Sequence, residues 1–146
     1  MPAIPPYRRI LAAVDLTDSS RAVAERAADV ARIGGGSLHL LHVVEFVPPV
    51  PMGDTMVPAV QIDDELISHA RTKLAALAAS MGLPPQSTSV EVGSAKSEVL
   101  RCARAQQCDL IVLGGRERHG LSILVNHTED TVLHGAPCDV LAVRVP

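Results

Sequence analysis

The sequence predicts a three-layer α/β domain in which helices cover both faces of a parallel sheet of five strands. The chain has 146 residues, a length that suits one domain. Hydrophobic residues make up 47% of it, yet it holds one Tyr, one Phe and no Trp, so its core must consist of Ala, Val, Leu and Ile. Short apolar runs alternate along the chain with segments of helical periodicity, which is the pattern of a doubly wound fold.

Each expected strand is a short run bounded by polar, Gly or Pro residues. Residues 10–14, 38–43 and 110–113 are mostly apolar, which predicts central strands that are buried on both faces. Residues 87–92 are more polar and are therefore expected at an edge of the sheet. A last apolar run at residues 140–143 completes the set.

Four helices are expected between these strands. The first begins among the N-cap residue types at 17–20 and ends at the glycines 34–36. The second starts with acidic residues that suit a helix N-terminus. Its apolar stripe consists of Ile62, Leu66, Ala70, Leu74, Leu77 and Met81. The third covers residues 94–107 and the fourth 121–134, while the proline-rich residues 45–61 are expected to form a long irregular loop.

Composition and charge exclude several classes of function. A formal charge of −3 and a pI near 6.0 provide no basic surface for nucleic acid. No apolar run is long enough for a bilayer, and the N-terminus lacks the regions of a signal peptide. The three cysteines include no Cys-x-x-Cys pair, so the cytoplasm is the expected location. Cys102 and Cys138 are expected to pack as small hydrophobes, and Cys108 to be more exposed.

Neither a metal centre nor a catalytic set is indicated. The chain has six His and three Cys, but no pair of them has zinc-finger spacing. His39 and His42 belong to opposite faces of one strand, and His119, His127 and His134 come together only if the turn before them folds back on the helix. There is no nucleophile elbow and no Ser-His-Asp order. The protein is therefore not expected to be an enzyme.

Five segments of the chain follow one another in a characteristic order. They are Arg-Ile-Leu-Ala-Ala-Val-Asp at 9–15, Leu-Leu-His-Val at 40–43, Cys-Asp-Leu-Ile-Val-Leu-Gly at 108–114, Arg-His-Gly-Leu at 118–121 and Ala-Pro-Cys-Asp-Val-Leu-Ala-Val-Arg at 136–144. Together they resemble the universal stress protein family over nearly the whole chain. The resemblance implies an adenine-nucleotide alpha-hydrolase-like sheet of order 3-2-1-4-5 and a cytoplasmic role in stress survival. It also implies a homodimer formed through the last strand, at Val140, Leu141, Ala142 and Val143.

Members of this family that bind ATP carry a glycine motif after the fourth strand, where backbone N–H groups and a helix N-terminus hold phosphates. The first glycine of that motif matches Gly114, but the second falls at Glu117. The glycine-serine pair falls at Asn126-His127, although a one-residue slip would place Thr128 at the hydroxyl position. The carboxylate of Glu117 would repel a triphosphate by ~1–4 kcal/mol unless a metal ion lies between them. The resemblance therefore predicts a degenerate site.

The half of the site for adenosine matches the family better. Asp15 stands where the family uses an aspartate for the adenosine end of the ligand, and Val43 where a backbone group contacts the adenine. From the residues alone, Asp15 could equally cap the next helix and Val43 could simply belong to the core. Arg116 and Arg118 offer phosphate contacts or form a solvated turn.

These features predict a non-enzymatic, cytoplasmic universal stress protein that acts as a homodimer in the stress response and has a degenerate nucleotide site. The alternative is a regulatory switch that binds ATP or AMP and changes its contacts with an unidentified protein partner. A weak ATPase or self-phosphorylating enzyme is a third hypothesis. No nucleic-acid, membrane or metal partner is expected.

Overall fold

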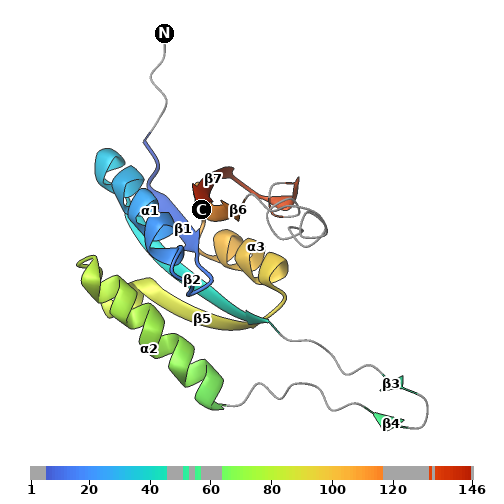
Figure 1. The fold of residues 1–146 in the computed structure, drawn as a ribbon. Coiled ribbons are helices and arrows are strands. Elements are labelled where there is room, and N and C mark those ends of the chain that lie inside the picture. Colours follow the sequence, from blue (N-terminus) through green and yellow to red (C-terminus); the bar gives the residue numbers. More distant parts are fainter. Residues whose placement is uncertain are drawn as a thin grey trace.

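The fold is built on a five-stranded parallel sheet, shown in Figure 1. The computed structural model describes residues 6–45, 51–52, 55–56, 64–116, 132 and 134–145. The sheet strands are β1 (Arg9–Ala13), β2 (Ser37–Glu45), β5 (Thr88–Gly93), β6 (Leu110–Arg116) and β7 (Asp139–Val145). The helices are α1 (Ser20–Gly34), α2 (Asp64–Ser80) and α3 (Ala95–Ala105), with a 3-10 turn, η1 (Pro85–Ser87), before β5.

The strand order confirms the predicted topology. The sheet runs β5-β2-β1-β6-β7, which is order 3-2-1-4-5 when its strands are counted along the chain. Every neighbouring pair in this sheet is parallel. The three apolar runs form the central strands β1, β2 and β6, and the more polar run forms the edge strand β5, both as predicted.

Helices lie on both faces of the sheet, which gives the fold three layers (Figure 1). They pack on the sheet through two hydrophobic clusters, one on each face. Side chains alternate along β1, so Ile10 and Ala12 face the cluster with α1 and α2, whereas Leu11 faces the cluster with α3. These three side chains are at most 1% exposed. Because β1 is buried on both faces, its apolar run could be read directly from the sequence.

The ends of α1 follow the predicted residue types. Ser19 is the N-cap of α1, and Gly35 ends that helix with a left-handed φ of 67°.

The predicted apolar stripe of α2 is wrong at Leu66, whose side chain is 45% exposed. Burial in α2 begins at Ala70, because the first turn of the helix lies outside the core. No helix among the described residues is long and apolar enough to cross a bilayer.

The loop predicted at residues 45–61 contains a short antiparallel ribbon. Its two strands are β3 (Pro51–Met52) and β4 (Thr55–Met56). The remaining residues from 46 to 61 lie outside the described part of the chain, as does most of the helix predicted at 121–134. Val132 and His134 of the predicted helix are helical, and so is Gly135 directly after it.

The exposure predicted for Cys108 is wrong, because this residue is buried at 8% exposure. Cys138 is half-buried and packs against the cluster beneath α3, in agreement with its predicted packing as a small hydrophobe. The N–H of Cys108 donates to the Ala103 carbonyl over 2.9 Å, which folds the residue back against α3. Burial raises the pKa of the Cys108 thiol to about 11. This thiol therefore stays protonated at neutral pH.

Asp109 ties the start of β6 to the start of β1. Its carboxylate accepts the backbone N–H groups of Arg8 and Arg9 over 2.8 and 2.9 Å. The N–H of Asp109 donates in turn to the carbonyl of Arg9 over 2.9 Å. Partial burial raises the pKa of this carboxyl, but hydrogen bonds from backbone N–H groups, together with the charge of Arg8, outweigh it and hold the pKa below its ordinary value.

Asp109 should make the stability of the fold depend on acid. Its pKa is lower in the folded chain than in the unfolded chain, so its contribution is complete above the unfolded value and is lost as the pH falls through the folded value. The substitution Asp109→Asn is expected to cost about 1 kcal/mol or less at neutral pH, because solvent screens this exposed group. Urea denaturation between neutral pH and about pH 2 should give a smaller loss for Asp109→Asn than for the natural chain. Equal losses would contradict this role.

Candidate functional site

The candidate site lies at the carboxyl ends of three adjacent strands. In the sheet register, Ala12 of β1 is level with Leu40 of β2 and Val112 of β6. Three residues further along each strand direction come Asp15, Val43 and Gly115. In the sheet, β2 lies on one side of β1 and β6 lies on the other, so the strand order reverses direction at β1. This is the topological switch point, where open α/β sheets bind ligands.

Asp15 organises the loop between β1 and α1. Its Oδ1 accepts the backbone N–H of Thr17 over 3.1 Å, the hydroxyl of Thr17 over 2.6 Å and the hydroxyl of Ser20 over 2.9 Å. Between them, Leu16 adopts a left-handed φ of 61°, a conformation that costs a side-chain-bearing residue roughly 1–2 kcal/mol. The bonds of Asp15 hold this turn in place. These three bonds join Asp15 to the loop and to the Ser20 hydroxyl, and none of them reaches a backbone N–H within α1, so they do not show the helix cap that the sequence left open for Asp15.

The neighbouring strand β2 is tied to the same loop. Val14 donates its N–H to the Leu41 carbonyl over 2.9 Å, and its own carbonyl lies 2.8 Å from Nδ1 of His42. His42 thus serves the backbone at this end of the sheet. Val43, the next residue, is half-buried and packs against the cluster beneath α3. Its side chain belongs to the core, while its backbone lies beside the loop of Asp15.

Gly114 allows α1 to approach the end of β6. A Cβ atom at this position would lie 3.0 Å from Cγ2 of Val23 in α1. Val23 is 3% exposed and β-branched, so it has little freedom to move aside. The glycine that the resemblance assigned to phosphate binding therefore also has a packing role in this chain.

The described residues include Asp15 and Val43 of the predicted adenosine half and Gly114 and Arg116 of the predicted phosphate half. Asp15 lies in the loop that follows β1, Val43 lies in β2, Gly114 lies in β6 and Arg116 is the last residue of β6, so they come from three adjacent strands or the loop that directly follows one. The other predicted site residues lie outside the described residues, and these are Glu117, Arg118, Asn126, His127 and Thr128. Within the described part of the chain, no group of three His, Cys, Asp or Glu side chains could hold a metal ion.

Sequence reasoning did not identify Thr17 and Ser20 as partners of Asp15, or Val23 as the neighbour of Gly114. The N-cap residue types after β1 were a usable signal for the first two, because short hydroxyl side chains hydrogen-bond locally. The contact between Val23 and Gly114 joins residues 91 positions apart, and no local pattern encodes it.

The packing of Gly114 can be tested by a double-mutant cycle. The substitution Gly114→Val should lower the free energy of unfolding by about 1–3 kcal/mol, because its methyl groups would meet Val23. Combining it with Val23→Ala should cost less than the sum of the two single substitutions, since Val23→Ala removes the obstructing atoms. Urea denaturation of the four proteins measures the difference. Strict additivity would show that the two residues do not contact each other.

Comparison with known proteins shows the family. The model of the universal stress protein family matches residues 6–144. Universal stress protein A homolog 1 of Coxiella burnetii is 36% identical over 138 residues, which are 94% of this chain and 96% of that protein. Homolog 2 of the same organism is 34% identical over 140 residues, 95% of this chain and 96% of that protein.

Solved structures share the fold at lower identity. A universal stress protein of Pseudomonas aeruginosa superposes with a TM-score of 0.73 at 24% identity, and the match covers 98% of this chain but 50% of that one. This chain thus spans about half the length of that protein. The universal stress protein of Archaeoglobus fulgidus in complex with dAMP gives a TM-score of 0.62 at 19% identity, with 94% and 98% coverage. Because the family model and both Coxiella relatives match over nearly its full length, the chain belongs to the universal stress protein family.

Proposed function

We propose that this chain is a non-enzymatic, cytoplasmic universal stress protein that acts as a homodimer and has a degenerate nucleotide site. Its role in the stress response would be to bind a protein partner, with weak or no binding of ATP. One observation carries the proposal. Three of the four glycine-motif positions are changed, at Glu117, Asn126 and His127.

These substitutions oppose a triphosphate physically. The carboxylate of Glu117 adds a negative charge beside phosphates, and its Cβ fills space that a glycine leaves for close backbone approach. His127 places an imidazole ring where the motif has a small hydroxyl. Asn126 is the mildest change, because asparagine tolerates a left-handed backbone.

The residues of the described site support a binding role more than a catalytic one. The Oδ1 atom of Asp15 accepts three hydrogen bonds within its loop, and Nδ1 of His42 is bonded to a carbonyl. Both groups are therefore engaged in holding the backbone. The three cysteines are free thiols, in keeping with the reducing conditions of a cytoplasm.

A regulatory switch that binds ATP or AMP is the second candidate. The observation in its favour is that Asp15, in the loop after β1, lies at the switch point of the sheet beside the two strands that carry Val43 and Gly114. The Archaeoglobus fulgidus relative was solved with dAMP, a nucleotide with a single phosphate. A monophosphate would meet less repulsion from Glu117 than a triphosphate would, so AMP is the better ligand under this alternative.

The homodimer is supported by the position of β7. It is an edge strand, and among the described residues no strand pairs with its outer side. Val143 and Val145 are buried in the single chain, Val140 and Leu141 are half-buried, and Ala142 is exposed. An apolar edge strand of this kind favours pairing with a second copy about a two-fold axis.

Restoring the glycine motif should increase the affinity for ATP. Each backbone hydrogen bond to a charged phosphate can contribute ~1.5–3 kcal/mol, and 1.4 kcal/mol corresponds to a factor of ten. The triple variant Glu117→Gly, Asn126→Gly, His127→Ser is therefore expected to bind ATP at least roughly tenfold more tightly than the natural chain. Isothermal titration calorimetry with and without magnesium measures both affinities, and AMP is titrated in parallel.

A charge-matched control separates the motif from general electrostatics. Glu65→Gln removes one negative charge at an exposed position in the first turn of α2 and should leave ATP binding unchanged. Micromolar ATP or AMP binding by the natural chain would reject the degenerate site and favour the switch. Failure of the triple variant to bind would show that the motif is not what limits binding.

The dimer can be tested at one backbone position. Val14 donates to Leu41, so even-numbered residues of β1 bond to β2 and odd-numbered ones face β6. Along each parallel strand, the backbone groups of successive residues point alternately to the strands on its two sides. When this alternation is followed through the registered pairs of β1 with β6 and of β6 with β7, the backbone N–H of Ala142 points to the outer side of β7, away from β6. Ala142→Pro removes that outer donor. Light scattering at micromolar concentration should give twice 15.4 kDa for the natural chain and 15.4 kDa for Ala142→Pro.

The other edge of the sheet provides the matched control. By the same alternation, Val92 directs its N–H away from β2, and its side chain is 41% exposed. Val92→Pro should therefore leave the dimer mass unchanged. A monomer mass for the natural chain, or an unchanged mass for Ala142→Pro, would contradict pairing through β7.

A further inference from the structure

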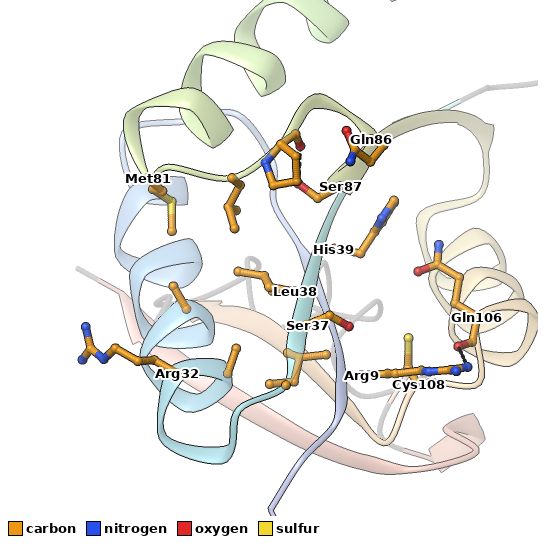
Figure 2. Close-up of a pocket in the computed structure, with 16 residues that line it drawn as sticks. Arg9, Arg32, Ser37, Leu38, His39, Met81, Gln86, Ser87, Gln106 and Cys108 are labelled. Carbon is orange, nitrogen blue, oxygen red and sulfur yellow. Dashed lines mark hydrogen bonds between the residues drawn. The ribbon is translucent and has the colours of Figure 1, made fainter.

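A cavity of about 610 Å³ lies at the amino ends of the strands, at the opposite end of the sheet from the candidate nucleotide site. It is lined by the first residues of β1 and β2, by η1, by the C-terminal half of α1 and by the turn after α3 (Figure 2). Its volume lies within the range of cavities that hold small organic ligands, roughly 300–1,000 Å³. The universal stress protein resemblance assigns no residue to this end.

The cavity exists because β2 begins before β5 does. The register between these strands starts at Leu40 and Thr88, so Leu38 of β2 has no strand residue opposite it. Ser37 donates its N–H to Arg8 on the β1 side, and successive residues direct their backbone groups to alternate sides. The N–H and C=O of Leu38 therefore point into the notch between β2 and η1.

One side of the notch is apolar. Leu38 and Ala31 are buried, and Met81 and Leu83 are half-buried beside them. Figure 2 shows Leu38 pointing toward Met81, while His39 points to the other side of β2. Ala28 of α1 lines the same wall. This half of the cavity can cover a hydrocarbon or aromatic group.

The other side of the notch is polar and carries a positive charge. Nη1 of Arg9 lies 3.3 Å from the Gln106 carbonyl and 3.3 Å from Oε1 of Gln107, and both acceptors are neutral. The cavity lining holds two arginines and no Asp or Glu, in a chain whose net charge is −3. Arg32, the second arginine, is paired with Asp29 over 2.9 Å. Among the described residues, Arg9 is thus the arginine of the lining whose guanidinium forms no ion pair with a carboxylate.

His39 adds a neutral polar group beside Arg9. Its Nε2 lies 2.8 Å from the hydroxyl of Ser89. Burial lowers the pKa of this imidazole below its ordinary value, although Glu91 acts in the opposite direction. At neutral pH the imidazole is uncharged, so the charge available to a ligand comes from the guanidinium groups.

We infer that this cavity binds a small organic monocarboxylate with an apolar body, such as a medium-chain or aromatic acid. The apolar body would lie against Leu38, Met81 and Leu83, and the carboxylate would bind the guanidinium of Arg9. A planar guanidinium fork matches the two oxygens of a carboxylate, which favours this head group. The site is independent of ATP binding, because it lies at the other end of the sheet.

Octanoate and 1-octanol are the probes that test this inference, because they have the same chain length and differ in charge. Calorimetry should give a dissociation constant of roughly 0.1–1 mM for octanoate and weaker binding for octanol. Arg9→Met should weaken octanoate binding about tenfold and leave octanol unaffected, because it removes the charge-assisted bond. Arg9 is exposed, so the variant should fold normally.

Two further variants complete the test. Arg26→Met removes an exposed arginine of α1 that does not line the cavity, and it should leave octanoate binding unchanged. Ala28→Leu narrows the apolar wall and should weaken both probes. The inference is overturned if octanoate does not bind at millimolar concentration, if octanol binds equally well, or if Arg26→Met has the same effect as Arg9→Met.

Discussion

The burial of β1 on both faces is the constraint on which the rest of the structure depends. Ile10 and Ala12 face α1 and α2, Leu11 faces α3, and hydrogen bonds join β1 to a strand on each side. A strand enclosed in this way has one register, because a slip of one residue would exchange its two faces. That register fixes what comes level with β1 at both ends of the sheet.

At the carboxyl end, the register places Asp15, in the loop after β1, at the same end of the sheet as Val43 of β2 and the glycines of β6. The chain uses these residues to hold itself together. Asp15 secures the left-handed turn at Leu16, and Gly114 makes room for Val23. The hydrogen bonds of Asp15 and the packing of Gly114 hold this framework together within the chain itself. Both residues therefore have a structural role that does not depend on a bound nucleotide.

At the amino ends of the strands, the same register leaves a cavity. The late start of β5 leaves the edge of β2 at Leu38 uncovered, and Asp109 closes the start of β6 against β1. This cavity is lined by an apolar wall and by Arg9, whose guanidinium forms no ion pair with a carboxylate among the described residues. The two ends of the sheet are therefore chemically different.

The sequence by itself determined the fold class, the central and edge strands and the strand order, the last through a family resemblance. The fold class and the positions of the strands depend on local periodicity and on residue types at helix ends, which neighbouring residues encode. It also supplied Asp15, Val43 and Gly114. Only the tertiary structure decided that Cys108 is buried, that Leu66 is exposed, that Val23 packs on Gly114 and that a cavity opens beside Leu38. Each of these features depends on where a helix ends relative to the sheet, or on contacts between residues far apart in the chain. Both are set by the packing of the whole domain and not by the local sequence pattern.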